Sequence, residues 1–142
     1  MTEVYNHPDA KVDIVLVHGL NGDPRMTWTA PKNGMFWPSQ LLPATLKNIH
    51  ARVLVYGYNA DVYAFGSGKS ASSDMIYQHA QTLIQNLAMD RKVEQVQDHP
   101  IIFVCHSLGG VLVGYKYTRA LLVAVCGVYY WQPLRFDSRS LT

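Results

Sequence analysis

The stretch that most constrains how this chain folds is residues 101–110, an apolar run that leads directly into a serine between small residues. Residues 101–105 suit a buried strand, and Ser107 follows them with Leu108-Gly109-Gly110 after it. A sharp turn from strand to helix lifts a serine hydroxyl clear of its own backbone, and it tolerates only small side chains beside the serine. The usual pattern is G-x-S-x-G, and Cys105 replaces the first glycine, so we expect some crowding. The pattern predicts that Ser107 is a catalytic nucleophile; the alternative is a serine that only caps the following helix.

A second apolar run, residues 12–17, leads into five residues typical of a loop that binds an oxyanion: His18-Gly19-Leu20-Asn21-Gly22. In such sites one N–H donor comes from the loop after this strand, and the other is the N–H of the residue after the nucleophile. We therefore expect the backbone amides of Leu20 and Leu108 to form an oxyanion hole, with His18 and Gly19 in its loop. Since the donors are amides, His18 is predicted to be a strand-end histidine that bonds to the backbone.

Further motifs complete a recognisable order along the chain: Val17-His18-Gly19-Leu20, Pro24-Arg25, Thr27-Trp28, Trp37-Pro38, Leu41-Leu42-Pro43, Tyr56-Gly57-Tyr58-Asn59-Ala60-Asp61 and His106-Ser107-Leu108-Gly109-Gly110. In this order they resemble the α/β-hydrolase fold, and more closely the DUF676-like serine esterase and lipase-like domains of the serine-active-site-containing proteins, often found in fungi. The resemblance covers about residues 10–113 and implies a three-layer αβα sandwich with a mostly parallel sheet, here a partial α/β-hydrolase fold. Residues 114–142 diverge from that family.

The length of 142 residues predicts a single domain, and 49% apolar with 15% charged residues predicts a globular one. A net charge of +2 is too small to indicate a nucleic-acid partner. Cys105 and Cys126 lack the spacing of metal ligands and are expected to be buried thiols, so we predict no metal and no cofactor. The first residues have no apolar core of a signal peptide, which predicts an intracellular protein.

The apolar patterns predict strands over about 12–18, 52–56 and 101–105, and a helix over about 37–47. A further helix is expected to begin at Asp74 as its N-cap, with apolar positions Ile76, Ala80, Leu83, Ile84 and Leu87 on one face. Another helix should follow Ser107. This alternation of strands and helices predicts a parallel sheet that has helices on both faces.

Residues 66–70, Gly-Ser-Gly-Lys-Ser, resemble the end of a phosphate-binding loop. Tyr63 stands where the first glycine is required, and the loop lies far from the preceding strand. Nucleotide binding through Gly66–Ser70 is therefore a weaker alternative to a loop beside the active site.

The catalytic triad is incomplete in this sequence. The order in α/β-hydrolases is Ser, then Asp or Glu, then His. No histidine follows Ser107, and Asp137 is the one carboxylate after it, to which we assign no role. We expect a C-terminally truncated hydrolase domain whose last apolar strand, 101–105, has a bare edge. Residues 120–131 are expected to add one strand or to extend a helix, and they are short for a membrane span.

Two functions remain open at this stage besides the weaker alternative of nucleotide binding. The first is a serine hydrolase that forms an acyl-enzyme on Ser107 from a small-molecule or lipid ester. The second is an inactive remnant that acts as an interaction module. By the resemblance, membrane association and a place in the mitochondrion or endoplasmic reticulum are expected, with the cytoplasm as the alternative. Five aromatic residues could line an acyl pocket or pack in the core: Trp28, Phe36, Trp37, Tyr58 and Phe65.

Overall fold

The computed structural model describes the backbone of residues 1–60, 69–116, 121–123 and 128–131, and the side chains of residues 1–60 and 74–115. Its strands form one sheet in the order β1-β3-β2-β4-β6-β5. Their bounds are β1 Thr2–Asn6, β2 Val12–Val17, β3 Ala51–Tyr56, β4 Ile101–Cys105, β5 Leu121–Val123 and β6 Val128–Trp131. The three central strands, β3, β2 and β4, are parallel, while β1 and the β5–β6 pair join them antiparallel.

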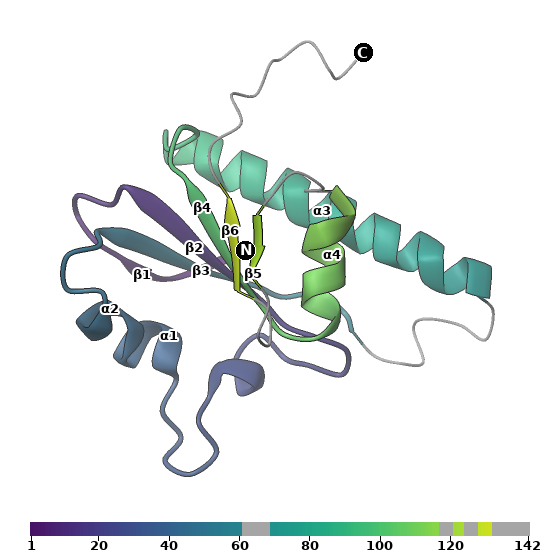
Figure 1. The fold of residues 1–142 in the computed structure, drawn as a ribbon, viewed down its shortest axis with the longest axis horizontal. Coiled ribbons are helices and arrows are strands. Elements are labelled where there is room, and N and C mark those ends of the chain that lie inside the picture. The colour runs from purple at the N-terminus through teal and green to yellow at the C-terminus, as the bar shows by residue number, and fades with distance from the viewer. Residues whose placement is uncertain (61–68, 117–120, 124–127, 132–142) are drawn as a thin grey trace.

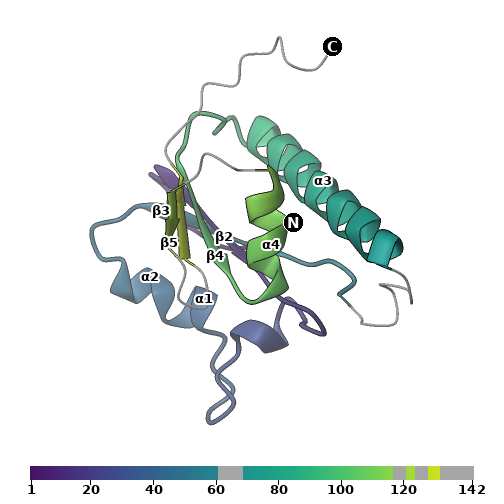
Figure 2. The same ribbon diagram turned by 45° about the vertical axis from the view of Figure 1, so that its right-hand side comes forward.

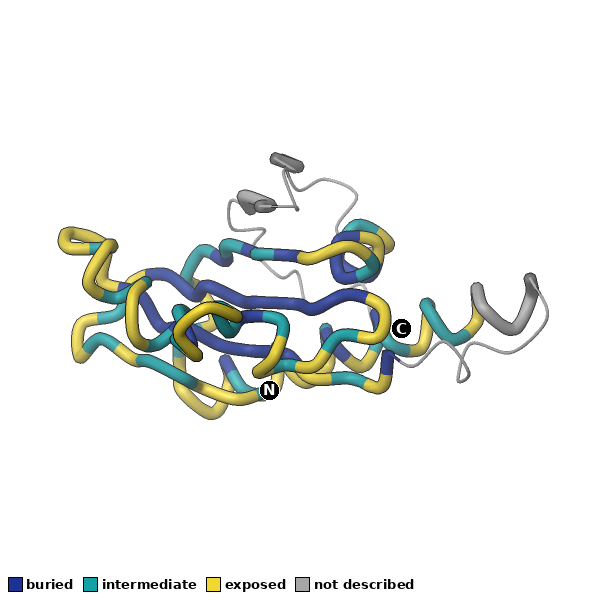
Figure 3. Tube along the Cα trace, turned by 90° about the horizontal axis from the view of Figure 1, so that it is seen from below, coloured by how far each residue is buried: buried dark blue, intermediate teal, exposed yellow. Residues whose placement is uncertain are grey.

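Helices cover both faces of this sheet (Figures 1 and 2). Helices α3 (Lys69–Val93) and α4 (Leu108–Lys116) lie on one face, and the 3-10 turn η1 (Met26–Trp28) with α1 (Trp37–Gln40) and α2 (Leu42–Thr45) on the other. Successive side chains of a strand point to opposite faces, so β2 and β3 are buried on both sides and appear as continuous dark runs in Figure 3. The predicted α/β fold class with helices on both faces is confirmed.

The core has two halves, one under each helical layer. The half under α3 and α4 contains Val15, Val17, Leu54, Tyr56, Phe103, Ala80, Leu83, Leu87, Leu112 and Val113. The half under η1 and α1 contains Ile14, Leu16, Val53, Val55, Trp28 and Phe36. Three predicted apolar positions of α3, at residues 80, 83 and 87, are thus buried against the sheet, as its helical spacing requires.

A buried ionic cluster joins α3 to the amino-terminal ends of two strands. Asp13, at the start of β2, accepts hydrogen bonds from Arg52 Nε and Nη2 at 3.0 and 3.1 Å. Arg91 of α3 donates to the same carboxylate at 2.7 Å and to the carbonyls of Gln97 and His99 at 2.6 Å each. Although burial opposes its charge, these contacts with Asp13 raise the pKa of Arg52. Arg52 also pairs with Asp90 at 2.8 Å, so two carboxylates balance the two guanidinium groups of the cluster, as buried ions require.

The two predicted helices around the central strands differ in their bounds from the structure. The expected helix over 37–47 is two single turns that break at Leu41, because Pro43 has no N–H to continue the hydrogen-bond ladder. Helix α3 begins at Lys69 instead of Asp74. Asp74 lies inside the helix and is not its N-cap, since no helix-breaking residue separates it from Lys69.

The edges of the sheet also correct the sequence analysis. Strand β1 was not expected; it pairs with β3 and has an irregularity between Glu3 and Tyr5. The expectation that β4 has a bare edge is wrong, because β6 pairs with it from Ile101↔Trp131 to Val104↔Val128. Residues 120–131 contribute two strands, β5 and β6, instead of one. In the part of the chain that the structure describes, no helix is both long and apolar enough to cross a membrane.

Candidate active site

The three central strands end in register, and His18, Tyr58 and Ser107 follow the ends of β2, β3 and β4. Val17 of β2 is paired with Tyr56 of β3 and with Cys105 of β4. After β2 the chain turns toward η1 and α1 on one face, and after β4 it turns into α4 on the other. In α/β proteins, ligands bind where loops diverge in this way at the carboxyl ends of parallel strands.

Ser107 lies in this turn between β4 and α4. The His106 N–H still donates to the Val17 carbonyl at 3.0 Å, and the next residues leave the sheet. Gly109 and Gly110 donate at 3.0 Å to the carbonyls of His106 and Ser107, which closes a tight turn into the helix. Ser107 has φ of 51°, a value that L residues seldom adopt, and it is exposed. Backbone strain of this kind concentrates at functional sites.

Two glycines let the loops after β2 and β4 touch each other. A Cβ on Gly19 would lie 2.7 Å from Ser107 Cβ and 2.7 Å from the carbonyl oxygen of His106. A Cβ on Gly109 would lie 2.6 Å from the carbonyl oxygen of His18. Real Cβ atoms do not come so close to backbone atoms, so only glycine fits at either place. The sequence brings Ser107 and the His18-Gly19 segment together, as an active site of this type needs.

The loop after β2 is a tight turn that orients one peptide group. The carbonyl of Gly19 accepts from the N–H of Gly22 at 3.0 Å, and Asn21 has φ of 52° within this turn. Asn21 also donates its N–H to the carbonyl of Ala60 at 2.8 Å. The carbonyl and the N–H of a trans peptide point in opposite directions, so the N–H of Leu20 is directed away from the groups that bind the Gly19 carbonyl.

His18 is a buried histidine whose two ring nitrogens both have partners. Nδ1 lies 3.0 Å from the carbonyl oxygen of Gly19, and Nε2 lies 3.4 Å from the N–H nitrogen of Tyr58. The ring of Tyr58 stacks on the imidazole with centroids 4.4 Å apart, and its hydroxyl donates to the His18 carbonyl at 2.9 Å. His18 thus bonds to the backbone as expected, and both ring nitrogens are occupied. Neither the sequence motif nor its spacing identified Tyr58 as its partner.

A model of the alpha/beta hydrolase family matches residues 14–141 of the chain. The chain belongs to the alpha/beta hydrolase family. The match spans the strand before His18, the turn at Ser107 and residues beyond α4. Neither the curated proteins nor the solved structures contain a significant match to the chain.

In an alpha/beta hydrolase the serine needs a histidine base. Among the side chains that the structure describes, none is hydrogen-bonded to the Ser107 hydroxyl. His106 is exposed next to Ser107, and its Nδ1 faces Gly19. His79 of α3 lies 5.2 Å from the Tyr58 ring, and burial lowers its pKa. The described residues therefore supply an exposed serine at a strained turn, but no side-chain base in contact with it.

Two further predicted features turn out to be parts of the core. Cys105 is buried under α3 and α4, and burial raises the pKa of its thiol, so it is an inert packing residue. Trp28 and Phe36 are buried, and Trp28 packs edge-on against Trp37 at 5.7 Å, so these aromatic residues fill the core under η1 instead of lining an acyl pocket. Phe65 and Cys126 lie outside the described residues.

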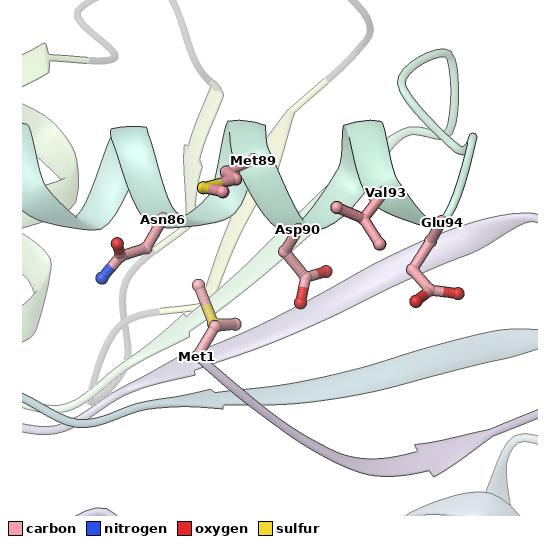
Figure 4. A pocket seen from close by; sticks show the side chains of 6 residues that line it. All are labelled: Met1, Asn86, Met89, Asp90, Val93 and Glu94. Atoms are coloured by element: carbon pink, nitrogen blue, oxygen red, sulfur yellow. The ribbon is translucent and has the colours of Figure 1, made fainter.

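Other groups that could bind a ligand lie away from Ser107. Gly66, Ser67 and Gly68 of the phosphate-loop-like segment are outside the described residues, as are the side chains of Lys69 and Ser70. An open pocket of about 290 Å³ lies over the last turns of α3 (Figure 4). It is lined by Met1, Asn86, Met89, Asp90, Val93 and Glu94. Its Asp90 pairs with Arg52 of β3 at 2.8 Å, and Met1 precedes Thr2, which pairs with Val55, so the pocket lies beside β3 and does not include Ser107.

One group of possible metal ligands lies near the amino-terminal end of β3. Ligand atoms of His7, Asp9 and His50 lie within 4.8 Å of one another. The two imidazole rings are stacked 4.0 Å apart with planes inclined by 12°. A metal ion binds imidazole in the plane of the ring, at about 2.0–2.1 Å from nitrogen. Two nearly parallel rings cannot both direct a lone pair at one ion, so this arrangement is a stack and not a preformed metal site.

Proposed function

We propose that this alpha/beta hydrolase is a serine hydrolase of the esterase or lipase type, with Ser107 as its nucleophile. One observation carries the proposal: the exposed Ser107, with φ of 51°, lies at a strand-to-helix turn against Gly19. The N–H groups of Leu20 and Leu108 are its proposed oxyanion donors. Leu108 is the first residue of α4, and the first N–H groups of a helix have no partner inside it.

The proposed reaction has two stages. Ser107 Oγ attacks the carbonyl carbon of an ester as its proton passes to a base, and a tetrahedral oxyanion forms between the two amides. Its collapse expels the alcohol and leaves an acyl group on Ser107, which water then removes. Removal of one oxyanion donor typically slows such a reaction by about 10²–10³-fold. The two amides therefore contribute much of the expected rate, whatever group supplies the base.

An apolar acyl group fits the surroundings of this serine best. Leu20 is 43% exposed although it lies in the proposed oxyanion loop. Val111, one helical turn beyond Ser107 on α4, and Tyr115 after it are each 51% exposed. Together with the sequence resemblance to serine-active-site-containing proteins, these side chains support a small apolar or lipid ester as the substrate. The same resemblance supports membrane association and a place in the mitochondrion or endoplasmic reticulum.

Reaction with a fluorophosphonate probe tests the proposal. We expect the probe to label Ser107, and the Ser107→Ala variant to lose this label. Ser39→Ala, which removes a half-buried hydroxyl from α1, is the matched control and should keep it. Because no histidine follows Ser107 in the sequence, the experiment is run with and without added imidazole, which can act as an external base.

The outcomes of this experiment separate the two functions that the sequence leaves open. Labelling at Ser107 that imidazole accelerates indicates an activated site without its own base. If the folded protein resists the probe even in imidazole, or if Ser107→Ala is labelled as fast as the native chain, the hydrolase proposal is wrong. The remaining interpretation is then an alpha/beta hydrolase scaffold that acts as an interaction module.

A further inference from the structure

We propose that Tyr58 is a positioning residue for the oxyanion hole, because it holds His18 in one tautomer and thereby fixes the direction of the Leu20 N–H. This inference rests on the proposed function of Ser107 as a nucleophile. Tyr58 belongs to the segment after β3, the strand that pairs with β2. It therefore acts from the end of β3 on the loop that follows β2.

Tyr58 holds His18 through three separate contacts. Its N–H lies 3.4 Å from Nε2 of the imidazole, its ring stacks on the imidazole at 4.4 Å, and its hydroxyl donates to the His18 carbonyl at 2.9 Å. The ring planes are inclined by 12°, so the stack is nearly parallel. These contacts restrain both the side chain and the backbone of one residue, which a single hydrogen bond cannot do.

The hydrogen bond to Nε2 decides where the imidazole carries its proton. A neutral imidazole has one donor and one acceptor nitrogen. Since Nε2 accepts from the backbone N–H of Tyr58, the proton is on Nδ1, and Nδ1 donates to the carbonyl of Gly19 at 3.0 Å. A proton on Nε2 would face the Tyr58 N–H and leave the Gly19 carbonyl without this donor. The contact with Tyr58 and the contact with Gly19 therefore require the same tautomer.

Two donors then hold the Gly19 carbonyl, and the next N–H points the other way. The carbonyl accepts from His18 Nδ1 and from the N–H of Gly22, each at 3.0 Å. The Gly19–Leu20 peptide is trans, so its N–H is directed opposite to its carbonyl. Oxyanion donors work because they are oriented before the charge forms. The chain of contacts from Tyr58 through His18 to Gly19 provides this orientation at Leu20.

The surroundings keep Tyr58 suited to this task. Burial raises the pKa of its hydroxyl, so the phenol remains protonated and can donate. Two residues further on, the carbonyl of the buried Ala60 accepts the N–H of Asn21 at 2.8 Å. The segment after β3 thus contacts the proposed oxyanion loop at both of its sides.

The test compares Tyr58→Phe with Tyr56→Phe. Both variants lose one phenol hydroxyl that donates to a carbonyl, but the Tyr56 hydroxyl bonds to His79 at 3.5 Å and does not contact His18. The labelling rate of Ser107 by the fluorophosphonate probe is measured in each, because the phosphoryl oxygen occupies the position of the oxyanion. We expect about a tenfold slower reaction for Tyr58→Phe, in line with the loss of one hydrogen bond, and less than a twofold change for Tyr56→Phe.

A second readout follows the imidazole itself. The nitrogen chemical shifts of the His18 ring should show one neutral tautomer, with the proton on Nδ1, in the native chain and in Tyr56→Phe. Tyr58→Phe keeps the backbone N–H that binds Nε2, so it should show the same tautomer, and its slower labelling then reports on the lost bond to the His18 carbonyl. Unfolding free energies of both variants, measured with urea, show whether the fold is equally retained.

Two results overturn the inference: a proton on Nε2 of His18 in the native chain, or equal labelling rates of Ser107 in the two variants. Failure of the proposed function looks different, since Ser107 then stays unlabelled in the native chain and in both variants. In that case the ring nitrogen shifts still decide whether Tyr58 fixes the tautomer of His18.

Discussion

Helix α4 contains two glycines whose replacement by alanine should have opposite effects on stability. A Cβ on Gly109 would lie 2.6 Å from the carbonyl oxygen of His18, whereas a Cβ on Gly114 meets no atom within 4 Å. Both residues lie in the same nine-residue helix, so the change in the unfolded chain and in helix propensity is matched. The pair therefore isolates the contact between the start of α4 and the end of β2.

The size of each effect follows from two opposing terms. Alanine stabilises a helix by about 0.5–1 kcal/mol relative to glycine, and Gly114→Ala should show this gain. Overpacking costs about 1–3 kcal/mol, and the atom that the new methyl group meets at residue 109 is a backbone oxygen, which cannot rotate away. In Gly109→Ala the gain in helix propensity offsets part of the overpacking cost, so its free energy of unfolding should fall by up to about 2 kcal/mol. The free energies of unfolding of the two variants should therefore differ by about 1–3 kcal/mol.

Urea denaturation of the two variants and the native chain measures this difference, with the slope of the transition as a check that both unfold to the same extent. The Gly109→Ala variant should also react more slowly with the fluorophosphonate probe, because its helix can relieve the clash only by moving the turn at Ser107. If Gly109→Ala proves as stable as Gly114→Ala, the close approach of α4 to β2 is wrong, and the derived geometry of Ser107 fails with it.

Two further predictions concern charges at the other end of the sheet. Asp13→Ala leaves the guanidinium groups of Arg52 and Arg91 buried without their shared carboxylate, and it should lower the free energy of unfolding in urea by about 3–5 kcal/mol. Glu3→Gln removes a half-exposed partner 3.9 Å from Arg52 and should change this free energy by less than about 0.5 kcal/mol. Similar costs for the two variants would contradict the burial of the cluster. Burial lowers the pKa of His99 from 6.5, so the unfolded chain takes up this proton first, and the contribution of His99 to stability is present above pH 6.5 and lost as the pH falls below it. The native chain should therefore lose more stability between pH 7.5 and 5.5 than His99→Gln does, and parallel losses in the two would refute this assignment.

The central strands and the close approach of the loops after β2 and β4 could be predicted from the sequence because their signals are local. Each parallel strand is a short, nearly continuous apolar run, and each is followed by a glycine or serine motif that specifies a turn. The backbone bonding of His18 was also predicted, because the sequence analysis assigned the oxyanion donors to amides and left the imidazole without a catalytic role. The family match covers residues 14–141, which includes β3, β4, both loops and β2 from Ile14 onward.

The features that the sequence did not predict depend on residues that are far apart along the chain. Asp13 is 39 residues from Arg52 and 78 from Arg91, and no local pattern joins them. One signal was present: Asp13 and Arg52 are single charges at the beginning of apolar runs, and they are paired in register across β2 and β3. Strand β1 and the contacts of Tyr58 had no such signal, because the first is short and polar and the second depends on where the end of β3 lies relative to β2.

The two ends of the sheet contribute in different ways to the arrangement around Ser107. At the amino-terminal ends, Asp13 joins β2, β3 and α3 through buried ion pairs, and at the carboxyl-terminal ends glycines let the loops approach Ser107. The orientation of the serine and of the amides therefore depends on β2, β3, β4 and the helices packed on them, and not on the group that accepts the serine proton. A fluorophosphonate loses fluoride, which leaves without a proton, whereas an alkyl ester must expel an alkoxide that a general acid protonates. For this reason the probe needs no general acid, and with imidazole as the external base its labelling rate reports on the geometry around Ser107.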